Sequence, residues 1–303
     1  MNRLFGKLFS QPEPEKPPLT PEQAGIFSAL EGVGLRAVAD EVARAAQPSI
    51  RLIDQPPTVS ALPIGTCRLG GLPDLPPEMP WPVWKGVPMS FVCQLNLAEF
   101  AYLDLEHVLP AAGVLWFFYD ARQETYGADP SDRGGWQVTF YNGNLARLQP
   151  GQFPDGLPEG ARFKPAALTF DREMTVPLAP GNAAQGTAWP PDTIHRYEDW
   201  LFNRFTPQQR SVPHHRIFGY PDQIQDDMQL QSALVSQGFT SQDDPAAAQA
   251  VQTRGDWRLL LQIDSDPASG MRWGSAGRIF YWIESAPLKE LQFENTWLVM
   301  QSD

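Results

Sequence analysis

Cysteine is scarce in this sequence, and long hydrophobic runs are missing. Only two of the 303 residues are cysteines, Cys67 and Cys93, and both stand in apolar or strand-like settings. These settings favour two buried free thiols in a reducing cytoplasm over a disulfide. No apolar run approaches the roughly 18 residues that a membrane-spanning helix needs, so we expect no transmembrane segment.

Positive charge is also in short supply. Lysine and arginine number 23 against 35 aspartates and glutamates, so the formal net charge is −12. A protein that binds nucleic acid needs a basic surface to neutralise phosphates, and the sequence therefore predicts no nucleic-acid partner. The same charge favours solubility and permits a basic protein partner.

The usual motifs of catalysis and cofactor binding are missing. The four histidines and two cysteines have no paired zinc-ligand spacing, and the acidic stretch 264–266 lacks the pattern of a calcium loop. The glycine-rich stretch 270–277 lacks the Gly-Lys-Ser/Thr of a phosphate loop, and Ser275 does not stand in a nucleophile elbow. We therefore expect no metal and no cofactor. Catalysis stays open, and the sequence favours a protein that is not an enzyme.

Aromatic residues and prolines, by contrast, are plentiful. Hydrophobic residues make up 42% of the chain and include 10 tryptophans and 17 phenylalanines, enough for a large buried core. The 31 prolines are about twice the average usage. This composition predicts many short elements joined by fixed turns rather than long helices.

Three blocks of the sequence occur twice in the same order. RLGGLPD at 68–74 returns as RIFGYPD at 216–222, FVCQLN at 91–96 as LLLQID at 259–264, and GVLWFFYD at 113–120 as GRIFYWIE at 277–284. This order predicts a tandem duplication of one supersecondary unit. Two copies are too few for a solenoid. We therefore expect an α+β fold in which two similar β-rich half-domains, with interspersed helices, are related by a pseudo-two-fold axis.

The repeats divide the chain into five parts. We predict a flexible N-terminal tail at 1–19, an N-terminal helix at 20–48, the first half-domain at 50–150, a linker with a hairpin and a helix at 151–210, and the second half-domain at 211–303. The tail begins with apolar residues at helical spacing. The proline-rich residues that follow favour a frayed tail over a short surface-seeking helix.

Local patterns predict the individual elements. Strands are expected at 89–95, 113–119, 257–263, 277–284 and 296–301, helices at 97–108, 192–205, 222–236 and 287–291, and hairpins at 136–148 and 166–178. The first hairpin rests on Asn142-Gly143, which suits a two-residue turn between strands. The strand at 113–119 is apolar on both faces, which predicts a central position covered on both sides.

The repeated loops supply the first candidate site residues. In one interpretation Arg68, Asp74, Arg216 and Asp222 converge near the pseudo-axis and line a polar cleft. In the other, each arginine bonds a turn of its own repeat and each aspartate caps a turn or helix. Because the spacing is the same in both copies, we favour the structural role.

Four further residues are candidates for binding. Gln94 and Gln262 stand at equivalent places in apolar strands, where an amide without partners costs about 1–3 kcal/mol. Each amide therefore either clamps the neighbouring loop, which we favour, or points into a pocket. Trp273 either forms the wall of a pocket or covers the core, and Asp264 joins the candidates as a nearby carboxylate. The Trp81 and Trp84 pair is either an exposed patch or, as is commoner, a cover for the core.

The chain resembles the YwqG-like family, a bacterial domain of unknown function (1963). The resemblance rests on the repeated blocks, on MPWP at 79–82, on GYPDQIQDDM at 219–228 and on MRWGSAGRIFYWI at 271–283, and it covers roughly Leu62 to Ser302. It implies a soluble, internally duplicated α+β fold without accepted catalytic residues. Some relatives are thought to accompany bacterial toxin and secretion loci, which implies an immunity or partner-binding role. Where such sequences often have Asp in Trp-Gly-x-Ala-Gly, this chain has Ser275.

Three functions remain open. The first is a cytoplasmic protein-binding module, of the immunity or antitoxin type, whose partner is a toxin or a secretion-system component. The alternative is a small-ligand-binding or hydrolytic enzyme with a polar cleft at the repeat junction. The third is a scaffold without a ligand. A deep polar pocket between the repeats favours the enzyme, and a broad apolar or acidic face favours the binding module.

Overall fold

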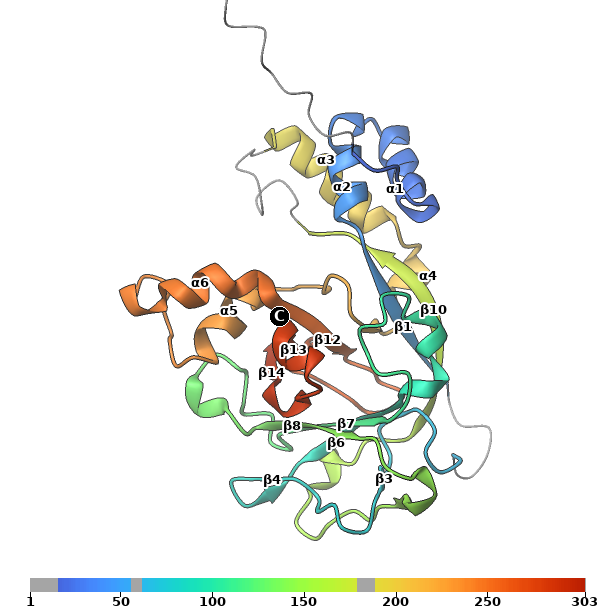
Figure 1. Cartoon of the computed structure of the whole chain (residues 1–303), viewed down its shortest axis with the longest axis vertical. Helices are drawn as coiled ribbons and strands as arrows, with labels where there is room; N and C mark the ends of the chain where they lie inside the picture. The colour runs from blue at the N-terminus through green and yellow to red at the C-terminus, as the bar shows by residue number, and fades with distance from the viewer. Residues whose placement is uncertain (1–15, 56–61, 179–188, 303) are drawn as a thin grey trace, which may run out of the picture. The chain divides into compact units, whose positions relative to one another are not determined.

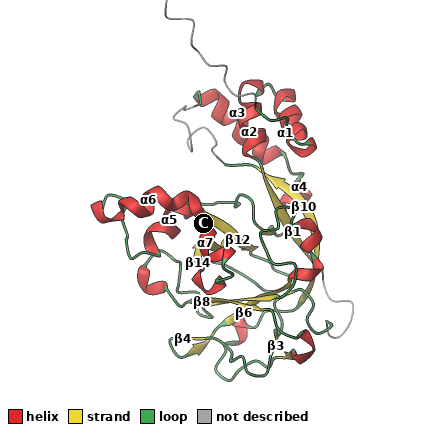
Figure 2. Ribbon diagram, viewed as in Figure 1, coloured by secondary structure: helices red, strands yellow, loops and turns green. Residues whose placement is uncertain are grey.

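The computed structural model describes residues 16–55, 62–178 and 189–302, and the chain forms two compact units (Figures 1 and 2). Of the described residues, one unit comprises 16–46 and 189–202, and the other comprises 47–55, 62–178 and 203–302. Most of the predicted flexible tail at 1–19 lies outside the described residues. Within the described ranges no helix is long and apolar enough to cross a membrane.

The smaller unit is helical. It contains α1 (Pro21–Gly32), α2 (Arg36–Ala45) and most of α3 (Pro191–Asn203). Thr20 caps α1 in a capping box with Gln23, as the sequence indicates. The helical segment predicted at 20–48, which Gly32 and Gly34 were expected to interrupt, forms two helices, because the chain turns at Gly34 with a φ of 74°. Residues 47 and 48 already belong to a strand.

The larger unit is built on one ten-stranded sheet in which every described pair of neighbouring strands is antiparallel. The strands are β1 (Gln47–Gln55), β2 (Arg68–Leu69), β6 (Ser90–Asn96), β7 (Val114–Tyr119), β8 (Trp136–Tyr141), β10 (Ala166–Thr175), β11 (His215–Ile217), β12 (Trp257–Asp264), β13 (Arg278–Glu284) and β14 (Trp297–Gln301). Their order is β14-β13-β12-β11-β1-β10-β2-β6-β7-β8. The fold therefore mixes helices and strands and is mostly β.

The sheet is nearly closed. Its end strands are linked through the loop after β7, where the Met300 N–H donates to the Tyr126 carbonyl at 3.1 Å. The Trp136 indole N–H donates to the Thr296 carbonyl at 2.9 Å, and the Trp136 and Trp297 rings are 4.8 Å apart. The middle of the sheet is the β1–β10 pair, which is in register from Gln47 opposite Thr175 to Gln55 opposite Ala167.

The core lies between the two ends of this curled sheet. All six residues of β7 are buried, and alternate ones belong to two hydrophobic clusters. The Phe117 and Tyr281 rings, from β7 and β13, lie 5.1 Å apart and so join opposite ends of the sheet in one cluster. The expectation that the strand at 113–119 is covered on both faces is confirmed.

Short elements complete the larger unit. Two small two-stranded sheets pair β3 (Asp74–Leu75) with β9 (Gln149–Pro150) and β4 (Val83–Trp84) with β5 (Val87–Pro88), and the helices are α4 (Pro207–Arg210), α5 (Met228–Val235), α6 (Ala248–Thr253) and α7 (Ser285–Lys289). Cys67 and Cys93 are buried free thiols, as predicted. Trp81 and Trp84 are partly buried and pack against the smaller cluster, so they cover the core.

Both predicted hairpins are wrong. Residues 166–175 form one continuous strand, β10, because its whole length pairs with β1. After β8 the chain does not return as a strand, since the Asn144 side chain accepts the Ala146 N–H at 2.9 Å and starts a helical turn at Leu145–Arg147. A local side-chain bond therefore replaces the strand pairing that Asn142-Gly143 suggests.

Two predicted helices also differ. Residues 97–108 contain only the single turns Leu97–Glu99 and Ala101–Leu103, and the Asp104 carboxylate then accepts the Leu109 N–H at 2.8 Å. The helix expected at 222–236 begins at Met228 with Asp227 as its N-cap. The predicted strands and the helix at 192–205 are confirmed to within about two residues, the usual uncertainty of element ends.

Gly127 gives a test of how the sheet closes. Its φ is 73°, its carbonyl accepts the Trp297 indole N–H at 2.9 Å, and an added Cβ would clash with the Leu298 backbone oxygen. Gly127→Ala should therefore destabilise the fold by about 2 kcal/mol or more beyond the strain of a positive φ. Gly156→Ala is the matched control. Gly156 also has a positive φ, 85°, but the nearest atom to a Cβ added there is Pro88 Cδ at 3.9 Å, so the substitution causes no clash. Equal urea midpoints for the two variants would contradict this account of closure.

Candidate functional site

A buried ionic network holds the first repeated loop. The Arg68 guanidinium contacts Asp74 Oδ2 at 2.5 Å, and the two side chains are 8% and 1% exposed. Arg68 also donates to the Leu72 carbonyl at 3.0 Å. Gln94, on the neighbouring strand β6, accepts the Asp74 N–H at 2.8 Å and donates to the Thr66 carbonyl at 2.8 Å. The network thus bonds the loop 66–74 to the sheet.

The second repeated loop has the same network. Arg216 contacts Asp222 Oδ2 at 2.8 Å and donates to the Tyr220 carbonyl at 2.9 Å. Gln262, on β12, accepts the Asp222 N–H at 2.8 Å and donates to the His214 carbonyl at 2.6 Å. Each bond joins residues at the same relative positions as in the first loop. The geometry is that of two clamps that hold their own loops.

The two networks do not meet. The strands that carry Arg68 and Arg216, β2 and β11, are separated in the sheet by β1 and β10. Three inter-strand steps place them about 14 Å apart across the sheet. The arrangement in which both arginines and both aspartates converge on one cleft is therefore not the one that the structure shows.

The second network is the more polar and the more accessible. The Asp222 side chain is 28% exposed, and the His214 Nδ1 atom lies 3.5 Å from its carboxylate. Burial by itself raises the pKa of Asp222, but Arg216, His214 and Gln262 outweigh it and hold that pKa below its usual range. Arg216 also lies 3.2 Å from Glu173. Asp222 is therefore an ionised carboxylate at neutral pH.

Equivalent positions beside the two networks carry different side chains. Cys67 Sγ accepts the Asn96 N–H at 3.0 Å, whereas His215 Nδ1 accepts the Asp264 N–H at 3.1 Å. His215 is fully buried, and burial lowers its pKa to about 3. The ring is therefore neutral at pH 7, with Nδ1 as the acceptor and the proton on Nε2.

Asp264 and Trp273 lie beside the second network and are bonded to each other and to its neighbours. The Asp264 carboxylate accepts the His214 N–H at 2.9 Å and lies 3.2 Å from Arg278. Trp273 is completely buried, and its indole N–H donates to the Asp264 carbonyl at 3.2 Å. Of the two interpretations left open for Trp273, the structure places it in the core.

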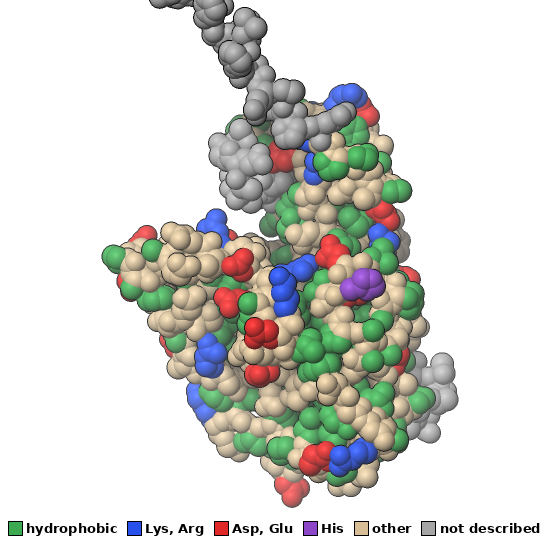
Figure 3. Space-filling view, in the orientation of Figure 1, with side chains coloured by type: hydrophobic (Ala, Val, Ile, Leu, Met, Phe, Trp, Pro, Cys, Tyr) green, Lys and Arg blue, Asp and Glu red, His purple; other side chains and the backbone are tan. Residues whose placement is uncertain are grey.

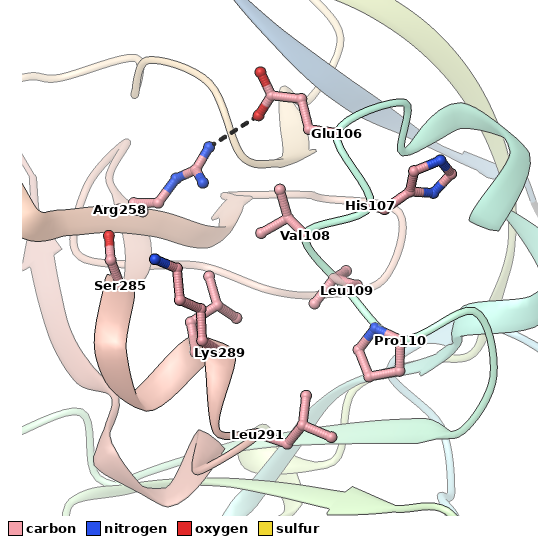
Figure 4. Close-up of a pocket in the computed structure, with 10 residues that line it drawn as sticks. Glu106, His107, Val108, Leu109, Pro110, Arg258, Ser285, Lys289 and Leu291 are labelled. Atoms are coloured by element: carbon pink, nitrogen blue, oxygen red, sulfur yellow. Dashed lines mark hydrogen bonds and ion pairs between the residues drawn. The ribbon is translucent and has the colours of Figure 1, made fainter.

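A pocket of about 630 Å³ lies in another part of the larger unit (Figure 4). We call it the central pocket. One wall is the loop segment 106–110, and the others are Arg258 of β12 and the residues of and after α7, including Ser285, Lys289 and Leu291. Arg258 forms an ion pair with Glu106 at 3.2 Å. Val108 and Leu109 give the pocket an apolar side.

Two smaller pockets share walls with the central pocket. An apolar pocket of about 280 Å³ shares His107, Leu109 and Pro110 with it and is also lined by Tyr102. A polar pocket of about 310 Å³ shares Arg258 and Ser285 with it and is also lined by Trp257 and Trp282. The three pockets adjoin one another at these shared residues, and together we call them the groove.

The sequence did not point to the groove. Its residues come from three distant segments without a common spacing, and residues 97–108 were expected to be helical. The positive φ angles of His107 (51°) and Leu291 (59°) shape its walls, and neither residue type predicts such an angle. The apolar stretch after Glu106 was the one feature of the sequence that could have indicated a binding surface here.

Comparison with known proteins gives one match. A family model described as a domain of unknown function (DUF1963) matches residues 67–302, a span that contains both networks and most of the groove. No curated protein matches the chain.

Removal of either network arginine should destabilise the fold. Arg68→Ala leaves the Asp74 carboxylate buried and unpaired, and we expect a loss of about 3–5 kcal/mol. Arg216→Ala should cost about 1–3 kcal/mol, because water reaches Asp222. Arg272→Ala, at an exposed position, is the control and should stay within about 0.5 kcal/mol. Thermal and urea unfolding decide the matter, and an unchanged stability in either network variant would contradict the structural role.

His215 should make stability depend on pH. Its folded pKa, about 3, lies below the unfolded value of about 6.5. The unfolded chain therefore binds more protons between these values, and the stability present above pH 6.5 should fall by about 2 kcal/mol by pH 5. His215→Cys copies the side chain at Cys67, keeps an acceptor for the Asp264 N–H and should remove this slope. Urea titrations at pH 7, 6 and 5 test it, and an identical slope in the variant would exclude His215 as the cause.

Proposed function

The chain belongs to the DUF1963 family, and from its own side chains we propose that it is a protein-binding module whose groove holds a segment of a partner protein. The observation that carries this proposal is the groove together with its apolar rim. Tyr102 is 69% exposed and lines the groove, Leu105 on the same segment is 55% exposed, and Leu291 on the opposite side is 37% exposed. Large exposed apolar side chains around a concave surface are typical of sites that bind a protein segment.

The size of the groove supports the same function. Its central pocket, at about 630 Å³, falls within the range of about 300–1,000 Å³ that is usual for ligand sites. The networks around Arg68 and Arg216 are engaged with their own loops, so they do not compete for this role. Three adjoining pockets suit an extended chain better than a compact small molecule.

We further propose that the partner is a basic protein and that the module acts in the cytoplasm as an immunity or antitoxin protein of a toxin or secretion locus. The net charge of −12 supports a basic partner, because opposite charges steer association. The resemblance to the YwqG-like bacterial proteins supports the immunity role. On the face in Figure 3 acidic and basic side chains lie close together near the middle, among hydrophobic ones.

We also propose that the larger unit arose by duplication of one half-domain. The two networks have the same bonds between corresponding residues. The strand order outward from the β1–β10 pair is β2-β6-β7-β8 on one side and β11-β12-β13-β14 on the other. A break in register occurs at 91–93 in one arm and at 259–261 in the other. These correspondences support two copies related by a pseudo-two-fold axis.

Substitutions on the rim test the binding function. Tyr102→Ser combined with Leu291→Asn removes two exposed apolar side chains, and asparagine tolerates the positive φ at Leu291. The double variant should have the melting temperature of the wild-type protein. It should bind at least about tenfold less of a specific partner, because the loss of side chains at the centre of an interface has an effect of this size. Val83→Ser, at a position 57% exposed outside the groove, is the control. Quantitative pull-downs from the native cell decide it. A partner set that is identical for all three proteins would contradict the proposal.

A further inference from the structure

We infer that the groove selects a partner segment in which an acidic side chain stands beside apolar ones, and that Lys289 anchors the carboxylate. This inference rests on the proposed binding function and adds the chemistry of the bound segment. It assigns a role to a lysine that neither the repeats nor the network residues single out.

Lys289 is the cation of the central pocket that has no partner. It is exposed at the end of α7, and among the described residues it has neither an ion pair nor a hydrogen bond through its side chain. Figure 4 shows its ammonium group on the side of Ser285 and Arg258, across the pocket from Val108 and Leu109. An ammonium group in this position is available to a ligand.

The lining of the central pocket carries an excess of positive charge. Two cations, Arg258 and Lys289, stand against one carboxylate, Glu106, which is already paired with Arg258 at 3.2 Å. Asp104 accepts the Leu109 N–H, and Glu290 accepts from Gln292. Glu284 and Asp256, which are close in the chain to Ser285 and Arg258, do not line the central pocket. In a chain with a net charge of −12 this local balance favours an anionic group.

The surroundings of Lys289 specify what flanks the anion. Val108, Leu109 and Leu291 line the same pocket, so a bound segment must place apolar side chains next to its carboxylate. Burial of those side chains removes water from the ion pair, and an ion pair is stronger where the effective dielectric constant is lower. The pocket therefore favours an acidic residue with apolar neighbours over an isolated acid.

The arrangement of the three adjoining pockets favours one source for the carboxylate. Pockets lie on both sides of the central one, the apolar pocket beyond His107 and the polar pocket beyond Arg258. A chain that occupies them passes Lys289 without ending there. The carboxylate therefore belongs to an aspartate or glutamate side chain of the partner and not to its C-terminus.

Selection from a random peptide library tests this inference. The probe is a library of random decapeptides, each inserted within a carrier protein so that the decapeptide has no free terminal carboxylate. Binders are selected from this library with the full-length protein. We expect enrichment of sequences with Asp or Glu beside apolar residues. Binding of these sequences should fall at least about tenfold with Lys289→Gln, the loss expected when binding buries a charge pair. Lys289→Arg should restore it, and Lys164→Gln, at an exposed lysine outside the groove, should leave it unchanged.

Each other outcome has a definite meaning. Enriched sequences without an acidic preference that are lost with Tyr102→Ser and Leu291→Asn would overturn the Lys289 anchor and leave the binding function in place. Enrichment only in a parallel library with free C-termini would overturn the side-chain source of the carboxylate. The absence of any peptide that depends on the groove would overturn the proposed function itself.

Discussion

The fold of the larger unit depends on one interaction that occurs twice, an arginine and an aspartate from one loop bonded through a glutamine of the next strand. In the first network the Arg68 and Asp74 side chains are almost completely buried. Two charges out of water are tolerated only when their remaining hydrogen-bonding groups also find partners. Gln94 meets part of this requirement, because its amide donates to Asp74 Oδ2 at 3.1 Å, while Arg68 Nε and Asp74 Oδ1 have no partner among the described residues. The short strands β2 and β11 therefore keep their places although they contain only two and three residues.

The same clamp surrounds different chemistry in the two halves. A thiol in the first half and a neutral imidazole in the second accept equivalent backbone N–H groups. This position therefore requires a side chain that accepts a hydrogen bond from the backbone N–H, and either a thiol or an imidazole meets that requirement. The groove lies apart from both clamps and is formed by the loop segment 106–110 against β12 and α7. Rigid clamps hold the frame, and the loops between the strands supply the surface for binding.

Some elements of the fold could be predicted from the sequence and others could not, and the difference has physical reasons. The apolar strands β6, β7, β12 and β13 were predicted because their burial follows from composition, and the network residues because each kept its spacing in both copies. The hairpins were wrong because a longer-range pairing, β1 with β10, and a local bond from Asn144 prevailed over turn preference. The groove could not be predicted, since Arg258, Lys289 and Glu106 come to line one pocket only through the tertiary fold.

The place of β1 in the middle of the sheet has a consequence for biosynthesis. Its partners are β10 and β11, which begin at Ala166 and His215, so both of its edges stay unpaired while more than a hundred further residues are translated. At about 5–20 residues per second this interval lasts on the order of ten seconds. An unpaired strand is a template for aggregation. The edges of β1 are therefore open to wrong pairing during this interval. Separate expression of the first half-domain, residues 50–150, would remove β10 and β11 and leave both edges unpaired permanently.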